Sequence, residues 1–204
     1  MDPRWKHPFT AIVAGPTGCG KTVFTFKFIS ESQDLITPPP EKIIYCYGEY
    51  QEIFNNYPHV TFIEGLPDIS QFDGKQRTLV ILDDLMTETN DSVSNIFTKV
   101  SHHRNVSVVY LSQNLFYKSK QNRTMSLNAH YMVLFKNPRD AVQVATLARQ
   151  TYPGRSKFLA EAFKDATDKA YGYLLIDLKP DTEEKYRIRT NIFPGERQYV
   201  YVPK

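Results

Sequence analysis

The chain has 204 residues, of which 41% are hydrophobic and 23% charged, and its formal net charge is +3 at pH 7. This length fits one α/β domain with a full core and excludes two sizeable domains, and the mildly basic charge permits nucleic-acid contact without requiring it. Two cysteines exclude a disulfide framework, and no run of 18 apolar residues or signal-peptide pattern occurs, so we expect a soluble protein in a reducing compartment, neither secreted nor in a membrane.

The first motif follows the apolar run 9–14, which predicts a buried strand after an irregular lead-in over residues 1–8. Residues 15–22 fit the phosphate-binding pattern G-x-x-x-x-G-K-[ST] at every fixed position, and a helix is expected over 21–30. Glycines let backbone N–H groups turn inward around an anion, and the helix N-terminus adds the positive end of its dipole. The predicted nucleotide-binding residues are therefore Gly15, Pro16, Thr17, Gly18, Cys19, Gly20, Lys21 and Thr22.

Three side chains of this loop have expected chemical roles. Lys21 would reach the β- and γ-phosphates, and the Thr22 hydroxyl would bind Mg²⁺. The Cys19 thiol lies near a helix N-terminus, which predicts a lowered pKa. The alternative is an ordinary glycine-rich turn between a strand and a helix.

The second motif is the apolar run 78–82 followed by Asp83 and Asp84, which has the form of a Walker B strand. It comes after expected strands at 42–47 and 60–63 and a short helix at 50–55. A strand end at this place delivers a carboxylate to the phosphate-bound metal, so Asp83 is predicted to hold Mg²⁺ and Asp84 to act as general base. The alternative is a pair of solvated acids.

A helix is expected over 91–103, with an apolar stripe of Val93, Ile96, Phe97 and Val100. The strand after it ends in a third group of polar residues. The strand predicted at 106–111 leads into Ser112-Gln113-Asn114. The Gln113 amide could bond both the γ-phosphate and the attacking water, or simply cap the strand end.

The remaining segments complete the predicted fold. They are an exposed basic loop at 117–122, a strand at 129–135, helices at 140–149 and 156–167, and hairpin strands at 171–177 and 186–192. Alternating strands and helices with long crossovers predict an α/β fold with a mostly parallel central sheet flanked by helices, ending in a C-terminal β-hairpin over 171–193. One domain is expected over residues 1–204.

These motifs together, including Leu-Val-Ile-Leu-Asp-Asp-Leu-Met and the segment from Ser101 to Phe116, resemble the FtsK–HerA group of P-loop ATPases of RecA/ASCE type. The likeness spans roughly residues 9–149 and is closest to the poxvirus-type DNA-packaging ATPases of large DNA viruses and of Maverick/Polinton and adintovirus elements. Here the second acid is Asp, where the wider superfamily usually has Glu, so its carboxylate reaches less far.

The resemblance implies an ATP- and Mg²⁺-dependent motor that translocates double-stranded DNA in viral genome packaging. It further implies a homo-oligomeric ring, a hexamer or pentamer, that works with a capsid or portal vertex protein. Its location would be the host nucleus or cytoplasm, and the virion if packaged.

Ring ATPases of this kind use an arginine of the neighbouring subunit to stabilise the transition state. The candidates are Arg123 and Arg104, with Arg139 a weaker third; the alternative for each is a solvated surface side chain. The basic segment 118–123, with Phe116 and Tyr117, could contact the DNA backbone in a pore, or be merely solvated.

Three other functions remain open at this point. A helicase or initiator ATPase of AAA+ type would need a sensor arginine on a C-terminal helical lid. A P-loop nucleotide or small-molecule kinase would need an arginine-rich lid, and a nucleotide-binding scaffold would bind ATP with little turnover.

Overall fold

A nine-stranded sheet is the central element of the computed structural model, which describes residues 2–83, 85, 90–114, 120–139 and 141–203. The strand order is β11-β10-β9-β8-β2-β7-β6-β4-β5. The six strands β8, β2, β7, β6, β4 and β5 are parallel to one another. The pairs β8–β9, β9–β10 and β10–β11 are antiparallel. The strands are β2 (Thr10–Ala14), β4 (Lys42–Tyr47), β5 (Thr61–Glu64), β6 (Thr78–Asp83), β7 (Val106–Ser112), β8 (Tyr131–Phe135), β9 (Tyr173–Asp177), β10 (Ile188–Thr190) and β11 (Tyr199–Tyr201). The predicted fold class is confirmed, and β11 extends the C-terminal hairpin by one edge strand.

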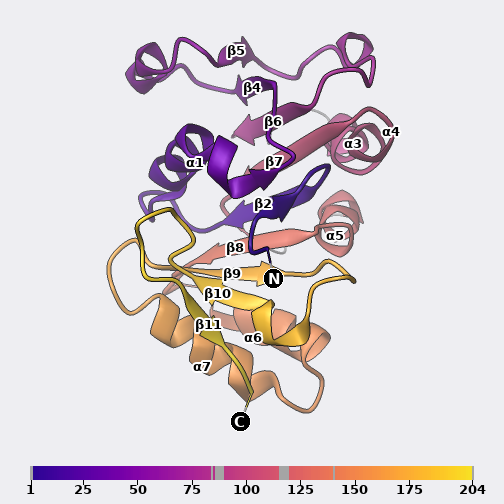
Figure 1. The fold of residues 1–204 in the computed structure, drawn as a ribbon. Helices are drawn as coiled ribbons and strands as arrows, with labels where there is room; N and C mark the ends of the chain where they lie inside the picture. Colours follow the sequence, from indigo (N-terminus) through magenta and orange to yellow (C-terminus); the bar gives the residue numbers. More distant parts are fainter. Residues whose placement is uncertain (1, 84, 86–89, 115–119, 140, 204) are drawn as a thin grey trace.

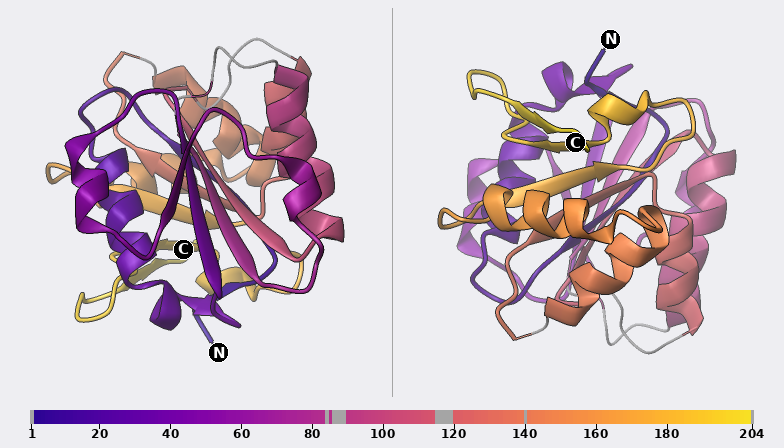
Figure 2. Two further views of the ribbon diagram at one scale, coloured as in Figure 1. Left: turned by 90° about the horizontal axis from the view of Figure 1, so that it is seen from above. Right: turned by 90° about the horizontal axis from the view of Figure 1, so that it is seen from below.

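Helices cover both faces of this sheet (Figures 1 and 2). One face carries α1 (Lys21–Ser30), α2 (Ser32–Leu35) and the 3-10 helix η1 (Glu52–Asn56). The other carries α3 (Asn90–Asn95), η3 (Ile96–Val100), α4 (Ser101–His103), α5 (Lys120–Leu127), α6 (Ala141–Thr151) and α7 (Ser156–Ala166). Short 3-10 turns η2 (Ile69–Gln71) and η4 (Glu184–Tyr186) lie in the connections.

The parallel strands are apolar throughout because both of their faces are covered. In β6, Val80 and Leu82 pack into the cluster under α3 to α7, whereas Leu79 and Ile81 pack into the cluster under α1. All four side chains are fully buried. Successive side chains of a strand point to opposite faces, so a continuous apolar run is what a doubly covered strand needs.

Aromatic packing holds α1, whose phenylalanines and β-branched residues are poor helix formers. Phe24 lies edge-on to Tyr173, with ring centroids 4.9 Å apart. Phe26 stacks on Tyr45 at 5.2 Å, and Phe28 lies 4.7 Å from the ring of Trp5. Tertiary burial therefore fixes this helix.

Three segments differ from expectation. The lead-in contains β1 (Trp5–Lys6), which pairs in parallel with β3 (Ile36–Thr37), because the buried Trp5 ring anchors it. Residues 120–122, expected in a basic loop, belong to α5, whose Met125 is buried in the core; residues 115–119 lie outside the described chain. The helix over 91–103 includes the π-helical turn η3, and its predicted apolar stripe is buried.

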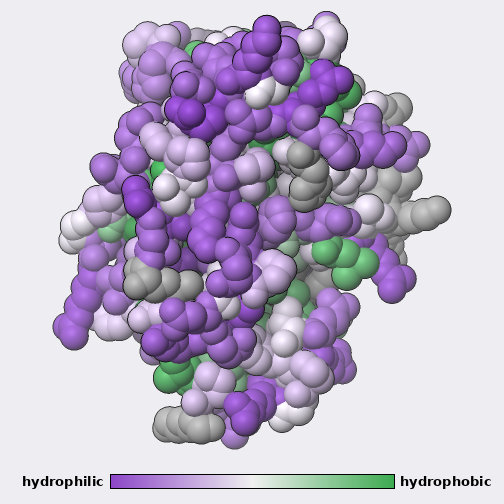
Figure 3. All heavy atoms as spheres, turned by 45° about the vertical axis from the view of Figure 1, so that its right-hand side comes forward, coloured by the Kyte–Doolittle hydropathy of each residue, from purple (hydrophilic) through white to green (hydrophobic). Residues whose placement is uncertain are grey.

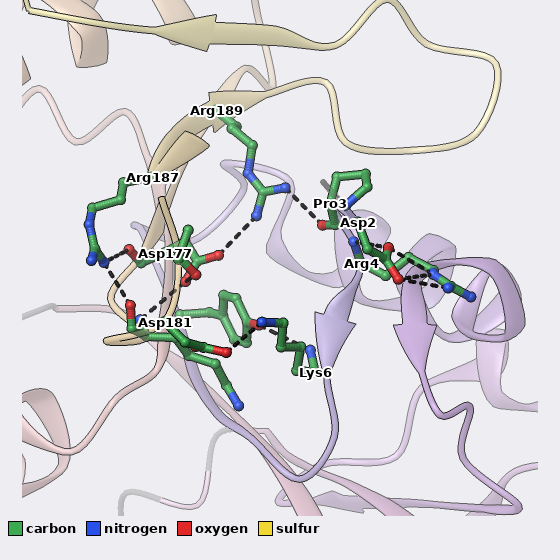
Figure 4. A network of polar contacts seen from close by, with 11 residues as sticks. Asp2, Pro3, Arg4, Lys6, Asp177, Asp181, Arg187 and Arg189 are labelled. Carbon is green, nitrogen blue, oxygen red and sulfur yellow. Dashed lines mark hydrogen bonds and ion pairs between the residues drawn. The ribbon is translucent and has the colours of Figure 1, made fainter. Parts of the chain in front are cut away.

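A buried ion pair joins the hairpin strands β9 and β10 to the N-terminal segment (Figure 4). The Arg189 guanidinium lies 3.2 Å from Asp177 Oδ2, and the two side chains are 3% and 6% exposed. Asp177 also accepts a hydrogen bond from the Thr182 hydroxyl, and Arg189 donates to the Pro3 carbonyl at 2.8 Å. The first residues of the chain are thereby tied to its last strands.

The surface is polar over most of the face shown in Figure 3, where hydrophobic residues form small, separate areas. Within the described residues, no helix has the length and apolar character needed to cross a membrane.

The buried ion pair predicts a large loss of stability when one partner is removed. Arg189→Met should lower the free energy of unfolding by about 3–5 kcal/mol, because it leaves the Asp177 carboxylate buried without its cation. Urea unfolding followed by circular dichroism measures the change.

Lys6→Met is the matched control. Lys6 and Asp181 also form an ion pair, but their side chains are 40% and 59% exposed. This exposed pair should contribute less than about 1 kcal/mol. Equal destabilisation by the two substitutions would contradict the role given to the buried pair.

Candidate active site

The carboxyl ends of four neighbouring strands lie at one level. Val13 of β2 is in register with Leu111 of β7, Leu111 with Asp83 of β6, and Asp83 with Tyr47 of β4. The segments that follow these strands therefore emerge at the same edge of the sheet. The phosphate-binding motif, the Walker B acid and Gln113 are thus brought together by strand register.

The loop after β2 depends on two glycines. A Cβ on Gly15 would lie 2.6 Å from Cys19 Sγ and 2.7 Å from Phe135 Cβ, so no side chain fits there. Gly20 precedes α1 with φ of +107°, a conformation that glycine adopts without strain. The first turn of α1 carries no acidic side chain, which leaves its N–H groups and dipole available to an anion.

The Lys21 ammonium lies against this loop. Its Nζ donates to the Gly15 carbonyl at 2.5 Å and to the Pro16 carbonyl at 3.0 Å. A positive charge is thus held beside the inward-facing backbone of the loop, where it would attract phosphate oxygens.

A cavity of about 540 Å³ opens at this edge of the sheet. Among its lining residues are seven that the sequence predicts: Thr17, Gly18, Gly20, Lys21, Thr22, Asp83 and Gln113. Sequence reasoning did not assign the remaining lining residues to the site, among them Tyr47, Glu49, Tyr50 and Tyr171. Glu49 could have been found by the strand-end rule, since it follows β4 as Gln113 follows β7.

Asp83 is oriented by a buried tyrosine that sequence reasoning also missed. The Tyr45 hydroxyl donates to Asp83 Oδ2 at 2.6 Å, and its ring is fully buried against Phe26 of α1. Burial, with the neighbouring carboxylate, raises the pKa of Tyr45 well above its usual value, so the phenol remains a donor. The only sequence signal was a tyrosine that lies between the apolar residues Ile44 and Cys46 of the strand.

The oxygen donors of this cavity fit Mg²⁺. The Thr22 hydroxyl and the Asp83 carboxylate line it together. Mg²⁺ prefers oxygen ligands and is usually held by one or two protein groups plus substrate phosphates and water. Among the described residues, no group of three or more His, Cys, Asp or Glu side chains is arranged to hold a metal.

Several predicted residues are not brought to this cavity within one chain. Asp84 lies outside the described residues. Arg104 precedes β7 at the opposite edge of the sheet and donates to the Phe72 carbonyl at 2.6 Å. Arg123 is exposed on α5, and Arg139 is exposed after β8, at the same edge as the phosphate loop.

The predicted lowering of the Cys19 pKa is wrong. Burial raises the pKa of this thiol, and the attraction of Lys21 and of backbone N–H groups offsets the effect only in part. The thiol packs beside Gly15, so desolvation exceeds the effect of the helix N-terminus.

The topology and the loop geometry define a P-loop NTPase fold, and solved structures share it. The genome packaging NTPase B204 of Sulfolobus turreted icosahedral virus 2 in complex with AMPPCP is 10% identical, with a TM-score of 0.55 over 100% of both chains. B204 of Sulfolobus turreted icosahedral virus, described as a DNA-packaging ATPase, gives 0.56 at 10% identity over 97% of this chain and 99% of that one. No protein-family model and no curated protein matches the chain.

The raised pKa of Cys19 predicts slow alkylation at neutral pH. Iodoacetamide labelling at pH 7, followed by peptide mass spectrometry, should be slower at Cys19 in the folded protein than in the urea-unfolded chain, and it should accelerate with rising pH as the thiolate forms. Cys46, which is fully buried and whose pKa is raised to about 12, should label more slowly still. Faster labelling of Cys19 in the folded state would contradict this assignment.

Proposed function

We propose that this chain is an ATP-hydrolysing motor of the FtsK–HerA kind that translocates double-stranded DNA during viral genome packaging. The observation that carries the proposal is one cavity lined by Lys21 and Thr22 at the start of α1, by Asp83 at the end of β6 and by Gln113 directly after β7. Such a cavity combines a cation, a hydroxyl, a carboxylate and an amide, which are the groups that phosphoryl transfer to water requires.

In this proposal the loop amides and Lys21 bind the triphosphate. Thr22 and Asp83 would hold Mg²⁺, which would neutralise phosphate charge when bound. Gln113 orients a water toward the γ-phosphorus, and Asp84 accepts its proton. The water oxygen forms a bond to phosphorus as the bond to the β,γ-bridging oxygen breaks, giving ADP and phosphate.

The packaging role is supported by the extent of the structural likeness. The similarity to B204 covers the C-terminal strands as well as the nucleotide site. We infer a homo-oligomeric ring, a hexamer or pentamer, in which Arg123, Arg104 or Arg139 acts on a neighbour's site. Its partners would be duplex DNA and a capsid or portal vertex protein, in the host nucleus or cytoplasm and in the virion.

The alternative of an AAA+ type helicase or initiator is less well supported. Such a protein would carry a sensor arginine on a helical lid after the core. The described residues after β8 instead form two helices, α6 and α7, and three antiparallel strands that continue the sheet.

The proposal predicts ATPase turnover that duplex DNA stimulates several-fold. Phosphate release measures the turnover, and light scattering gives the mass of the assembly. Phosphoryl transfer to a small acceptor without any effect of DNA would identify a kinase instead. Nucleotide binding without turnover, even with DNA, would identify a scaffold.

Lys21→Ala should abolish this turnover, because it removes the cation from the phosphate loop. Lys27→Ala is the matched control, since Lys27 lies on the same helix but pairs with Glu196 at the surface. Unchanged turnover in Lys21→Ala would refute the site.

The general base is tested by comparing two carboxylates. Asp84→Asn should lower turnover by about 10²- to 10⁴-fold while nucleotide binding is retained. Glu49→Gln is the informative comparison, because Glu49 lines the cavity and makes no hydrogen bond or ion pair within the described part of the chain. A large loss in Glu49→Gln with normal activity in Asp84→Asn would move the base to Glu49.

A further inference from the structure

An exposed tyrosine stands beside the phosphate loop at the end of the cavity away from the carboxylates. Tyr171 is 71% exposed and lies in the segment between α7 and β9 (Figure 1). A Cβ on Gly20 would be 3.1 Å from Tyr171 Cδ1, so the ring is adjacent to the residue that precedes α1. Tyr171 also lines a neighbouring hollow of about 310 Å³ together with Gly18, Cys19 and Lys136.

The backbone of Tyr171 is held in a conformation that tyrosine rarely adopts. Its φ is +62°, in the left-handed region that side chains with a Cβ avoid. The turn around it is fixed on both sides: Thr167 is bonded to the Phe163 carbonyl, and a Cβ on Gly172 would lie 2.4 Å from the Ala166 carbonyl oxygen. Such strain in an exposed residue is typical of ligand-binding sites.

Within the described residues, the Tyr171 side chain has no hydrogen-bond or ring partner that would account for this strain. Tyr50, which lines the same cavity at its Asp83 end, differs in this respect. Its hydroxyl donates to Asn55 Oδ1, and its ring lies edge-on to Phe54. Tyr50 is therefore held by its own surroundings, whereas the Tyr171 ring is available to a ligand.

The order of the residues along the cavity indicates which part of a nucleotide would lie beside Tyr171. Lys21 and the loop would hold the phosphates near its middle, and Asp83 and Glu49 lie toward the strand ends of β6 and β4, where the terminal phosphate would react. The nucleoside must then extend the other way, past Gly20 and Gly18 to Tyr171. An aromatic ring attracts any base by stacking on its π-face.

We propose that Tyr171 is the stacking platform for the base of a bound nucleoside triphosphate. This inference rests on the proposed function, because it assumes that the loop binds the triphosphate. It adds a base-binding site that the phosphate-binding motif does not contain.

The test compares two ligands that differ in the nucleoside: AMPPCP and inorganic tripolyphosphate, each with Mg²⁺, titrated into the full chain by calorimetry. Tyr171→Asn removes the ring and suits the left-handed backbone, because asparagine tolerates this conformation. It should raise the Kd for AMPPCP about tenfold, the scale of one base–aromatic stacking contact, and leave tripolyphosphate binding unchanged. Tyr171→Phe should bind AMPPCP like the wild type.

Two controls separate this inference from the proposed function. Tyr199→Asn, on the edge strand β11 outside the cavity, should leave both affinities unchanged, and Lys21→Ala should weaken both ligands. Unchanged AMPPCP affinity in Tyr171→Asn, or equal loss for both ligands, would overturn the base platform while leaving the phosphate site intact. If the wild type binds neither ligand, the proposed function fails, and the platform fails with it.

Discussion

The site depends on the parallel register of β2, β7, β6 and β4. Asp83 has the same strand parity as Leu79 and Ile81, whose side chains pack under α1, so its carboxylate belongs to the face that carries the phosphate loop and helix α1. A slip of one residue would turn that carboxylate toward the opposite face. The continuous apolar sequence of these strands, buried on both sides, therefore determines where the chemistry lies.

The aromatic layer beneath α1 connects this register to the helix. Phe26 of α1 stacks on Tyr45 of β4, and the Tyr45 hydroxyl bonds to Asp83 at the end of β6. One ring thus packs against the helix that follows the phosphate loop and also orients the acid. This packing outweighs the low helix propensity of the phenylalanines and positions both motifs.

Much of the fold could be predicted because its signals are local. The ranges of α1, β4 and β6 follow directly from apolar runs bounded by glycine, proline or acids. β1 and β3 have only two residues each and carry no such pattern. The start of α5 is polar and was therefore interpreted as a loop, although Met125 of this helix is buried in the core.

For the candidate site, the phosphate loop and the residues at the strand ends could be predicted from the sequence, because their motifs specify the chemical groups and their spacing. Tyr45 and Tyr171 were not, because their proximity to Asp83 and Gly20 arises only from tertiary packing. The prediction of a lowered Cys19 pKa was wrong for the same reason, because the helix N-terminus can be recognised in the sequence, whereas the burial of the thiol cannot.

The order of the strands also bears on how the protein is made. β2 lies near the start of the chain, yet it pairs with β7 and β8, whose residues are synthesised much later. Contacts between distant parts of a chain form slowly, because a long loop must close before they stabilise anything. On the ribosome, a nascent chain accordingly carries the glycine-rich segment long before the strands that flank β2 have been made, and this part of the sheet can be completed only after β8 has been synthesised.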